Sequence, residues 1–335
     1  MTIKDISAQT GYSIGTVSRV LNNQPNVSEK ARKAILEVAN ASGFQLNANA
    51  KQLKQQRATS ILAICKGISN ELFGSLIEAL QARVADWPYP LIVDYIDEDS
   101  DEVQRGIQLC REKKPLGILF LGGNMENFRR DLQHIDVPCV LVTGDASGLH
   151  SEKLSSVTTD DKQAGFLAVE HLAKLGHKNI AVIGGNREVS DIVRLRYEGC
   201  TAAVEKYGLR FHRELDYYSG RFSYADGYAA IQELLRRQRK FTAVFAMADV
   251  MAIGAIRALR DRGLRVPEDV SVIGVDGLAI GNYTVPTLAT VCQSVEELVS
   301  RSVQLLRRQI EGDTGAHYDT ILPVVLQKES TAPCK

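Results

Sequence analysis

Long apolar runs are missing from this sequence: no segment approaches the roughly 18 apolar residues that a membrane-spanning helix needs. The first residues, MTIKDISAQTGYS, contain no basic stretch followed by an apolar one, so we expect no secretory leader. Cysteine pairs are missing too, because the six cysteines are scattered without a C-x-x-C motif and several stand in apolar runs such as ILAIC and PCVLV. This pattern predicts buried free thiols in a reducing, cytoplasmic compartment.

Motifs for catalysis and cofactor binding are equally scarce. LFLGGN and VIGGNREV place paired glycines after an apolar run, but neither completes G-x-G-x-x-G or a phosphate-binding loop. His171 and His177 are six residues apart, which does not place them on one helix face. The sequence therefore predicts no catalytic residues, no metal site and no cofactor, and the protein is not expected to be an enzyme.

Net charge is zero over the 335 residues, but it is unevenly distributed. Residues 1–59 contain eight Lys or Arg and three Asp or Glu, so this segment has a net charge of +5 and the remaining chain −5. A small basic segment on a mildly acidic body is typical of a protein whose basic part contacts a polyanion. A solvated basic surface is the alternative that charge alone leaves open.

Three short helices are expected in this basic segment. Each is preceded by a residue type that caps helix N-termini: Thr2, Ser13 and Ser28. The helices are expected to end near Gly11, Asn22 and Ser42. Two short helices joined by a tight Gly-containing turn and braced by a third form a helix-turn-helix, although a generic three-helix bundle would have the same pattern.

The second of these helices, in SIGTVSRVLNN (residues 13–23), has the composition of a DNA-reading helix. Its apolar residues recur at spacings of three and four and should face a small core: Val17, Val20 and Leu21. The other face is left for DNA: Ile14, Gly15, Thr16, Ser18, Arg19 and Asn22. Arg19 is suited to pair bidentately with a guanine, and the hydroxyl and amide side chains can reach phosphates.

The basic stretch NANAKQLKQQR, residues 47–57, follows the third helix. Alone it is too short to be a stable helix in water, so it suits either a flexible basic linker or a helix that forms only on a partner. In the second case Leu53 would be an apolar wedge for the minor groove of DNA.

From residue 60 onward, apolar β-rich runs alternate with segments of helical period. The expected strands lie at 60–65, 90–96, 117–123, 138–144, 179–185, 242–247 and 270–277. Continuous apolar strands separated by helices predict parallel sheets covered on both faces, and the span is long enough for two of them. Ligands bind such sheets at the carboxyl ends of the strands.

Polar and aromatic residues cluster at those expected strand ends. The candidates for contact with a small polyol are Phe73, Asp160, Asp161, Arg194, Arg196, Phe222 and Asp276. Carboxylates and guanidinium groups bind hydroxyls, and aromatic rings stack on sugar faces. Each carboxylate could instead cap a helix, and for Asp249, which precedes VMAIGAIRAL, we expect capping.

The N-terminal sequence, and above all TVSRVLN and NANAKQL, resembles the DNA-binding head and hinge of the lactose-repressor/galactose-repressor (LacI/GalR) family of bacterial transcription regulators. The body resembles the same family over essentially its whole length, in stretches such as TDDKQAGFLAVEHLAKLGHKNIAVIGG and ADVMAIGAIRALRDRGLRVPEDVSVIGVDG. Three positions depart from the family pattern: Leu46 replaces a proline, Ala248 an asparagine and Gly277 an aspartate.

The resemblance implies an N-terminal all-α helix-turn-helix head followed by an α/β effector-binding domain of two parallel-sheet subdomains, similar to periplasmic binding proteins. The head would span residues 1–58, with a hinge helix at about 47–55, and the effector-binding and dimerisation domain 59–335. The first subdomain is expected at about 60–158 plus 290–320, and the second at about 159–289 plus 321–335.

The resemblance also implies roles for individual residues. The expected DNA contacts are Thr2, Ser13, Ile14, Gly15, Thr16, Ser18, Arg19, Asn22, Ser28, Asn47, Ala50, Lys51 and Leu53. Arg196 and Asp276 match the family's principal effector-binding pair, Phe73 and Phe222 match aromatic cleft positions, and Asp160 matches a less constant one.

Together these features predict a cytoplasmic, nucleoid-associated repressor that binds a pseudo-palindromic double-stranded DNA operator as a homodimer or dimer of dimers. A small molecule, expected to be a sugar, would control it allosterically, with no membrane contact. The alternatives are a sugar-binding receptor without a DNA role and an α/β sugar-metabolising enzyme.

Overall fold

The computed structural model describes residues 2–21, 27–42, 60–67 and 71–335, and the chain divides into two units, residues 1–57 and 58–335. Asn22 and the expected hinge helix, with Asn47, Ala50, Lys51 and Leu53, lie outside the described residues. None of the helices within the described ranges is long and apolar enough to cross a membrane.

The first unit contains the three expected helices. They are α1 (Ile3–Thr10), α2 (Ile14–Leu21) and α3 (Glu29–Ala41). The Thr2 side chain caps α1 in a capping box with Asp5, and Gly11 ends that helix in the left-handed conformation at φ 71°. The Ser28 hydroxyl accepts a 3.4 Å hydrogen bond from the Ala31 amide at the start of α3. Local chemistry therefore sets the helix boundaries here.

A small apolar core holds these helices together. It is formed by the buried side chains of Ile6, Val17, Val20, Ile35 and Ala39. One or two residues from each helix contribute, at the helical spacing that the sequence predicts, so the opposite face of α2 is turned to solvent.

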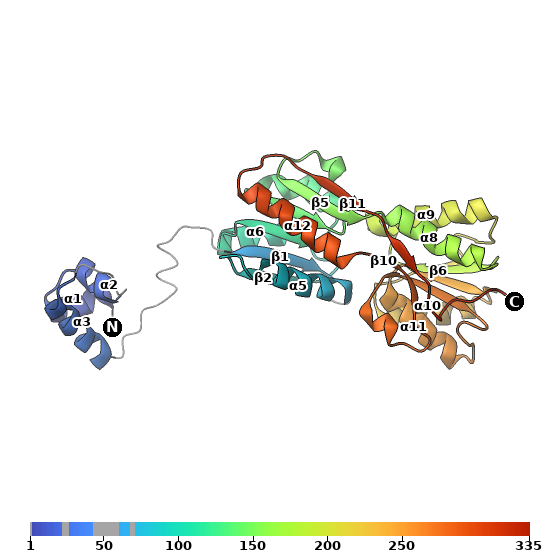
Figure 1. Cartoon of the computed structure of the whole chain (residues 1–335), viewed down its shortest axis with the longest axis horizontal. Helices are drawn as coiled ribbons and strands as arrows, with labels where there is room; N and C mark the ends of the chain where they lie inside the picture. The colour runs from blue at the N-terminus through green and yellow to red at the C-terminus, as the bar shows by residue number, and fades with distance from the viewer. Residues whose placement is uncertain (1, 22–26, 43–59, 68–70) are drawn as a thin grey trace. The chain divides into compact units, whose positions relative to one another are not determined.

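The second unit is built on two six-stranded sheets, which form the two lobes on the right of Figure 1. The first sheet has the order β11-β5-β4-β3-β1-β2 and is parallel throughout. Its strands are β1 (Ile61–Lys66), β2 (Leu91–Ile96), β3 (Gly117–Leu121), β4 (Cys139–Val142), β5 (Leu154–Thr159) and β11 (Tyr318–Ile321). Its helices are α5 (Glu71–Val84), α6 (Glu102–Lys113), α7 (Met125–Asp131) and α12 (Val295–Ile310), with 3₁₀ turns η1 (Leu132–His134) and η2 (Ser147–Leu149).

The second sheet repeats this topology, in the order β12-β10-β9-β8-β6-β7, with only β12 antiparallel. Its strands are β6 (Ile180–Gly184), β7 (Tyr217–Ser219), β8 (Ala243–Ala246), β9 (Ser271–Asp276), β10 (Ala289–Cys292) and β12 (Val324–Leu326). Its helices are α8 (Asp161–Lys174), α9 (Asp191–Tyr207), α10 (Tyr224–Arg236) and α11 (Asp249–Asp261), with the 3₁₀ turn η3 (Ala279–Asn282).

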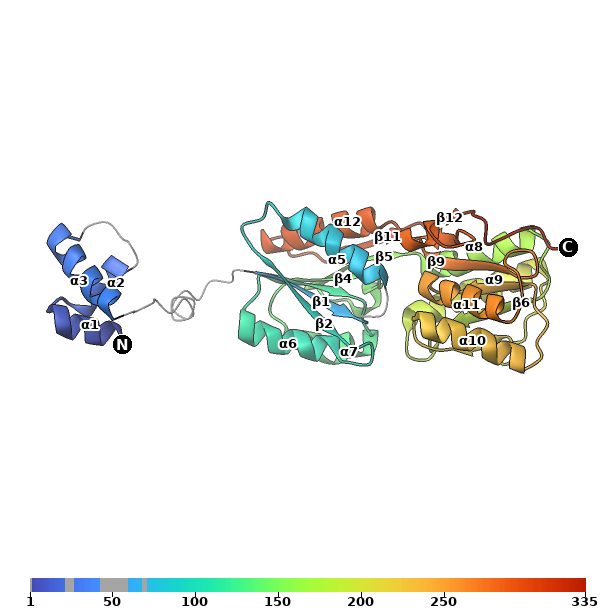
Figure 2. The ribbon, with the colours of Figure 1, turned by 90° about the horizontal axis from the view of Figure 1, so that it is seen from below.

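Helices cover both faces of each sheet, as continuous apolar strands require. In β1, Ile61 and Ala63 pack into the cluster that contains α5 and α12, whereas Leu62 and Ile64 pack into the cluster that contains α6 and α7. Figure 2 shows these two helix layers on opposite sides of the first sheet. The predicted fold class, a helix-turn-helix head with two parallel-sheet subdomains, is confirmed.

Three segments cross between the sheets. They connect β5 to α8, β10 to α12, and β11 to β12. The sequence placed residues 290–320 in the first subdomain, but β10 pairs with β9 and thus extends the second sheet to Cys292. The chain therefore crosses a few residues later than expected, because Thr290 and Val291 complete the second sheet's ladder.

Candidate functional site

A cleft of about 500 Å³ lies between the two sheets of the second unit. Residues at the carboxyl ends of the strands line it from both sides: Lys66, Thr143, Gly185, Ser219, Asp276 and Gln293. The volume falls in the range of small-molecule sites, roughly 300–1,000 Å³. The repeated doubly wound topology therefore places two ligand-binding edges opposite each other.

Arg196 is the centre of a buried polar cluster on the second sheet's side of the cleft. Its Nε lies 2.8 Å from Asp161 Oδ1, and its Nη1 donates to the main-chain oxygen of Met247. Asp276 Oδ1 lies 3.8 Å from the same Nη1 and accepts a 2.8 Å hydrogen bond from Gln293. Asp276 Oδ2 is buried and has no hydrogen-bond partner, so the cluster leaves one acceptor for a ligand.

Two glycines allow Arg196 to reach Asp161. On α8, a Cβ at Gly165 would lie 1.9 Å from the carbonyl oxygen of Arg196, and on α9, a Cβ at Gly199 would lie 1.8 Å from that of Lys162. Only glycine permits the two helices to approach backbone to backbone. The close approach brings the first turn of α8 beside the middle of α9.

Burial dominates the electrostatics of this cluster. It raises the pKa of Asp276 to about 6, against the opposing effect of Arg196, and raises that of Asp161 in the same way. Burial and the charge of Asp276 raise the pKa of Asp249 to about 8. Both effects favour the neutral form of Asp249 over its charged form.

Asp249 does not cap its helix, so the capping prediction is wrong. The N-cap position of α11 is Ala248, which makes no side-chain hydrogen bond. Asp249 Oδ2 instead accepts hydrogen bonds of 2.9 and 2.8 Å from the amides of Gly277 and Leu278. It holds the turn after β9, and Gly277 adopts a φ of 80° there. Asp249 thus positions Asp276 from behind the cleft.

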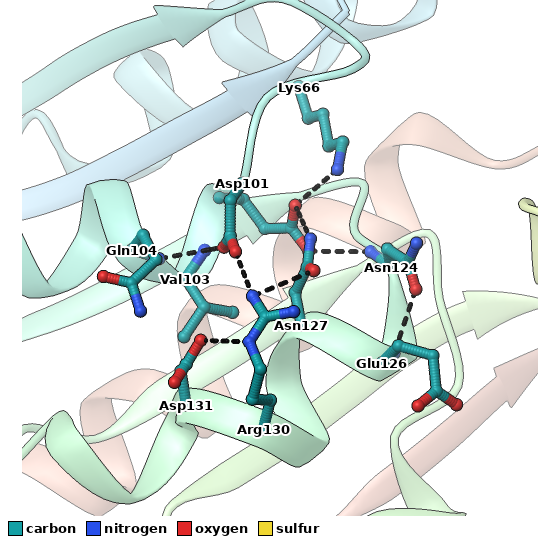
Figure 3. A network of polar contacts seen from close by, with 10 residues as sticks. Lys66, Asp101, Val103, Gln104, Asn124, Glu126, Asn127, Arg130 and Asp131 are labelled. Carbon is teal, nitrogen blue, oxygen red and sulfur yellow. Dashed lines mark hydrogen bonds and ion pairs between the residues drawn. The ribbon is translucent and has the colours of Figure 1, made fainter.

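A second polar network supports the first sheet's side of the cleft (Figure 3). Lys66, at the end of β1, pairs with the fully buried Glu102 at the start of α6. Glu102 also accepts hydrogen bonds from the Asn124 amide at 2.7 Å and from the Asn127 side chain at 3.1 Å. Asn124 caps α7, so the pair connects the cleft to two helix N-termini.

Thr143 is a cleft residue that the sequence reasoning missed. It follows β4, lines the cleft, and is buried with an unpartnered hydroxyl. Its φ is 67°, which is unfavourable for a β-branched residue. Such conformations persist where the surrounding fold imposes them, often at ligand sites. A single Thr in the stretch VTG has no sequence pattern that would have singled it out.

The predicted effector residues lie mostly at this cleft. Arg196 and Asp276 line it as members of the buried polar cluster, and Phe73 and Phe222 line it with their aromatic rings. Phe73 packs over Gly122, where its ring lies 3.0 Å from the position of a Cβ. Asp160 does not line the cleft; its carboxylate accepts a 2.8 Å hydrogen bond from the Gln163 amide and caps α8.

Arg221 joins the two sides of the cleft. From the turn after β7 it reaches three acidic residues that follow β2: Nε lies 2.9 Å from Glu98, Nη1 lies 3.6 Å from Asp97, and Nη2 bonds to Asp99. Tyr224 also donates a hydrogen bond across the gap, to Glu71. These contacts connect two sheets that share no strand pairing.

The solvent-exposed face of α2 carries three of the predicted DNA contacts, Ile14, Gly15 and Arg19. Ile14 is 50% exposed, and Gly15 and Arg19 are exposed as well. Ser13 accepts a 3.2 Å hydrogen bond from the Thr16 amide and so caps the helix, while Thr16 and Ser18 are half-buried. Thr2 and Ser28 lie at the N-termini of α1 and α3. The first unit thus exposes an apolar residue, a glycine and a cationic residue along α2.

Comparison with known proteins matches both units. Residues 2–47 match the model of "Bacterial regulatory proteins, lacI family", and residues 169–331 match that of "Periplasmic binding protein-like domain". Catabolite control protein A of Priestia megaterium is 32% identical to this chain over 94% of each sequence. The chain belongs to the LacI family.

Other LacI-family proteins are similar to this one over nearly its full length. The HTH-type transcriptional repressor PurR of Pasteurella multocida is 30% identical over 92% of each sequence. The structure of the transcriptional regulator CelR in complex with cellobiose has a TM-score of 0.72 at 26% identity, covering 98% of this chain and 99% of that one. This LacI-family protein is therefore a DNA-binding transcriptional regulator with an effector-binding domain.

Proposed function

We propose that this regulator is a repressor that binds a pseudo-palindromic operator as a homodimer and that a sugar in the cleft controls its operator affinity. One observation carries the proposal: the same chain has an exposed α2 face and a separate cleft. In that cleft, Oδ2 of Asp276 is buried and has no hydrogen-bond partner. Because the protein acts on chromosomal DNA, we place it in the cytoplasm with the nucleoid.

The chemistry of the cleft supports a sugar as the effector. Asp276 and Arg196 provide an acceptor and a charged donor group, and Phe73 and Phe222 provide aromatic surfaces. Sugars have pairs of hydroxyl groups, which can bind the carboxylate and the guanidinium group. They also have an apolar ring face, which can stack on the phenylalanine rings. The CelR structure, which contains cellobiose, supports the same class of ligand.

Exposed apolar side chains on the second unit support self-association. Tyr283 and Val285 are 83% and 80% exposed on the loop after η3, and Ile280 is also exposed. A two-fold dimer would bury such a patch against its own copy and would present two α2 helices to two half-sites. A dimer of dimers is the larger assembly that two such dimers can form.

The proposed DNA contacts are those of the α2 face, with Arg19 reading a base edge and Ile14 contacting a thymine methyl. The proposed coupling runs through the cleft. A ligand that binds both sheets changes their relative position, and the three crossing segments carry that change through the second unit.

Selection from random duplexes tests the DNA-binding part. The full chain should enrich a two-fold symmetric site, and Arg19→Ala should weaken binding to that site by about 1–3 kcal/mol. Arg257→Ala, which removes an exposed arginine paired with Asp261 on α11, is the matched control and should leave operator affinity unchanged. Failure to enrich any symmetric site would contradict the proposal.

A further inference from the structure

The charged residues of the cleft restrict the class of sugar. Three cationic side chains line it: Lys66, Arg196 and Arg221. Each is already paired with carboxylates of this chain. Lys66 pairs with buried Glu102, Arg196 with buried Asp161, and Arg221 with Asp97, Glu98 and Asp99.

Negative charge is in excess once these pairs are formed. Asp276 and Asp226 also line the cleft, and Asp226 bonds to the Ser223 hydroxyl at 2.6 Å rather than to a cation. Among the described residues that line the cleft, every cation therefore already has a carboxylate partner within the protein. Near the protein surface, two like charges about 4 Å apart repel each other by about 4 kcal/mol.

Recruiting Lys66 to a phosphate would leave Glu102 without its cation. Glu102 is fully buried, and its other two contacts, the Asn124 amide and the Asn127 side chain, are neutral donors. Breaking a buried ion pair by removing one partner is strongly destabilising, because the remaining charge stays desolvated. The ion pair of Lys66 and Glu102 therefore opposes a phosphoryl group at the first sheet's edge.

Two unpartnered polar atoms define what the ligand must supply instead. Asp276 Oδ2 on the second sheet and the Thr143 hydroxyl on the first sheet are both buried at the cleft without hydrogen-bond partners. The carboxylate needs a donor, and the Thr143 hydroxyl can donate or accept. Sugar hydroxyls meet both needs, and phosphorylation replaces one of these hydroxyls with a dianion whose oxygens only accept.

We propose that the cleft selects an uncharged polyhydroxylated ligand, an unphosphorylated sugar, and excludes the phosphate ester of the same sugar. This inference rests on the proposed function, and it specifies which members of the sugar class the regulator senses. The regulator would then respond to the free sugar and not to its phosphorylated form.

Calorimetry and thermal shift with matched pairs test the inference on the full chain. The pairs are glucose and glucose 6-phosphate, ribose and ribose 5-phosphate, and cellobiose and its 6-phosphate. We expect at least one neutral sugar to bind and its ester to bind at least about tenfold more weakly at low salt. An ester that binds as tightly as its parent sugar, or more tightly, would overturn the inference and leave sugar control intact.

Glu102→Gln is the decisive variant, because it keeps the shape of the side chain and releases the charge of Lys66. The preference for the neutral sugar should fall by about tenfold. Asp97→Asn, Glu98→Gln and Asp99→Asn together remove all three carboxylate partners of Arg221, and this triple variant tests the same idea there if Glu102→Gln does not fold. Asp136→Asn, at an exposed carboxylate outside the cleft, is the matched control and should leave the preference unchanged.

The remaining outcomes separate this inference from the proposed function. An unchanged preference in folded Glu102→Gln and in the Asp97/Glu98/Asp99 triple variant would show that charge pairing does not set the selectivity. If neither sugars nor esters bind, the sugar part of the proposed function fails and the inference with it. Operator binding measured on the same samples then shows whether the DNA-binding part stands.

Discussion

Asp276 combines a positive φ of 130°, nearly complete burial and one unpartnered oxygen. Its neighbours explain how this arrangement is maintained. Gln293 and Arg196 hold Oδ1, and Asp249 holds the amide of the next residue. The residue is therefore positioned before a ligand arrives, which reduces the ordering cost of binding.

The raised pKa of Asp276 predicts a pH-dependent sugar affinity. The ionised carboxylate accepts a stronger, charge-assisted hydrogen bond from a ligand hydroxyl than the protonated group does, and burial raises its pKa to about 6 in the ligand-free protein. Affinity should therefore be constant above about pH 7 and fall towards tenfold per pH unit below the pKa. The charged or titratable groups that face it are Arg196, Asp161 and Asp249.

Titration calorimetry from pH 5 to pH 8 measures this dependence. Asp276→Asn should bind the sugar weakly at every pH and should lose most of the dependence, since the titrating carboxyl group is gone. A wild-type affinity that stays flat down to pH 5 would contradict the role of Asp276 as an ionised acceptor.

Site residues differ in how far the sequence could predict them. Asp276 was predictable as a cleft residue from its place at the end of a strand. Arg196 lies within α9 and not at a strand end, so only its match to a family position singled it out. The role of Asp249 was not predictable, since its partners Gly277 and Leu278 lie on a turn far along the chain. Thr143 and Glu102 were missed because their importance arises from tertiary burial, which no local pattern records.

At the scale of elements, the strands with apolar runs were predicted and the others were not. β5 has the sequence LSSVTT and is buried at every position, yet its serines and threonines conceal it from a hydrophobicity pattern. Ser156 accepts a 3.0 Å hydrogen bond from the Ala146 amide, so its hydroxyl is satisfied within the fold. Short strands such as β7 and β12 have three residues each and give too little periodicity to detect.

The helix pair α8 and α9 yields a direct prediction. Gly165→Ala should push α9 away from α8 and destabilise the second unit by at least about 1–3 kcal/mol, because the new methyl group overlaps a backbone carbonyl. Sugar affinity should fall as well, since Arg196 moves relative to Asp161. Gly74→Ala on α5 is the matched control, because a Cβ there meets nothing within 4 Å.

Chemical denaturation of both variants checks this expectation. The control should be neutral or more stable by up to about 1 kcal/mol, which is the helix-propensity difference between alanine and glycine. Equal stability of Gly165→Ala and the wild type would show that the helices can separate without cost.

Gly15 in α2 is not required by the fold of the first unit. A Cβ there would lie 3.8 Å or more from the nearest atoms, which is ordinary contact. Gly15→Ala should therefore leave the helices intact or stabilise them by up to about 1 kcal/mol. Its operator affinity should fall and its base preference change, because the methyl group occupies space proposed for the DNA. Thermal unfolding and binding-site selection on one preparation separate these effects, and unchanged site preference would exclude a reading role for this position.

At the scale of the whole molecule, the proposed function depends on communication between ligand and DNA. Three crossing segments and the contacts of Arg221 and Tyr224 join the two sheets. Several carboxylates compete for Arg221 at the cleft mouth, so a ligand that enters there can change the balance of these contacts. Binding at the cleft can thus alter how the two sheets are held.

Fluorescence anisotropy of a labelled operator, selected as described above, tests the central claim most directly. The neutral sugar that binds the cleft should change the operator dissociation constant by about fivefold or more. Asp276→Ala should bind the operator like the wild type and lose the response to the sugar. If the sugar binds the wild-type chain but operator affinity stays the same at saturating sugar, the cleft does not control DNA binding and the account is contradicted.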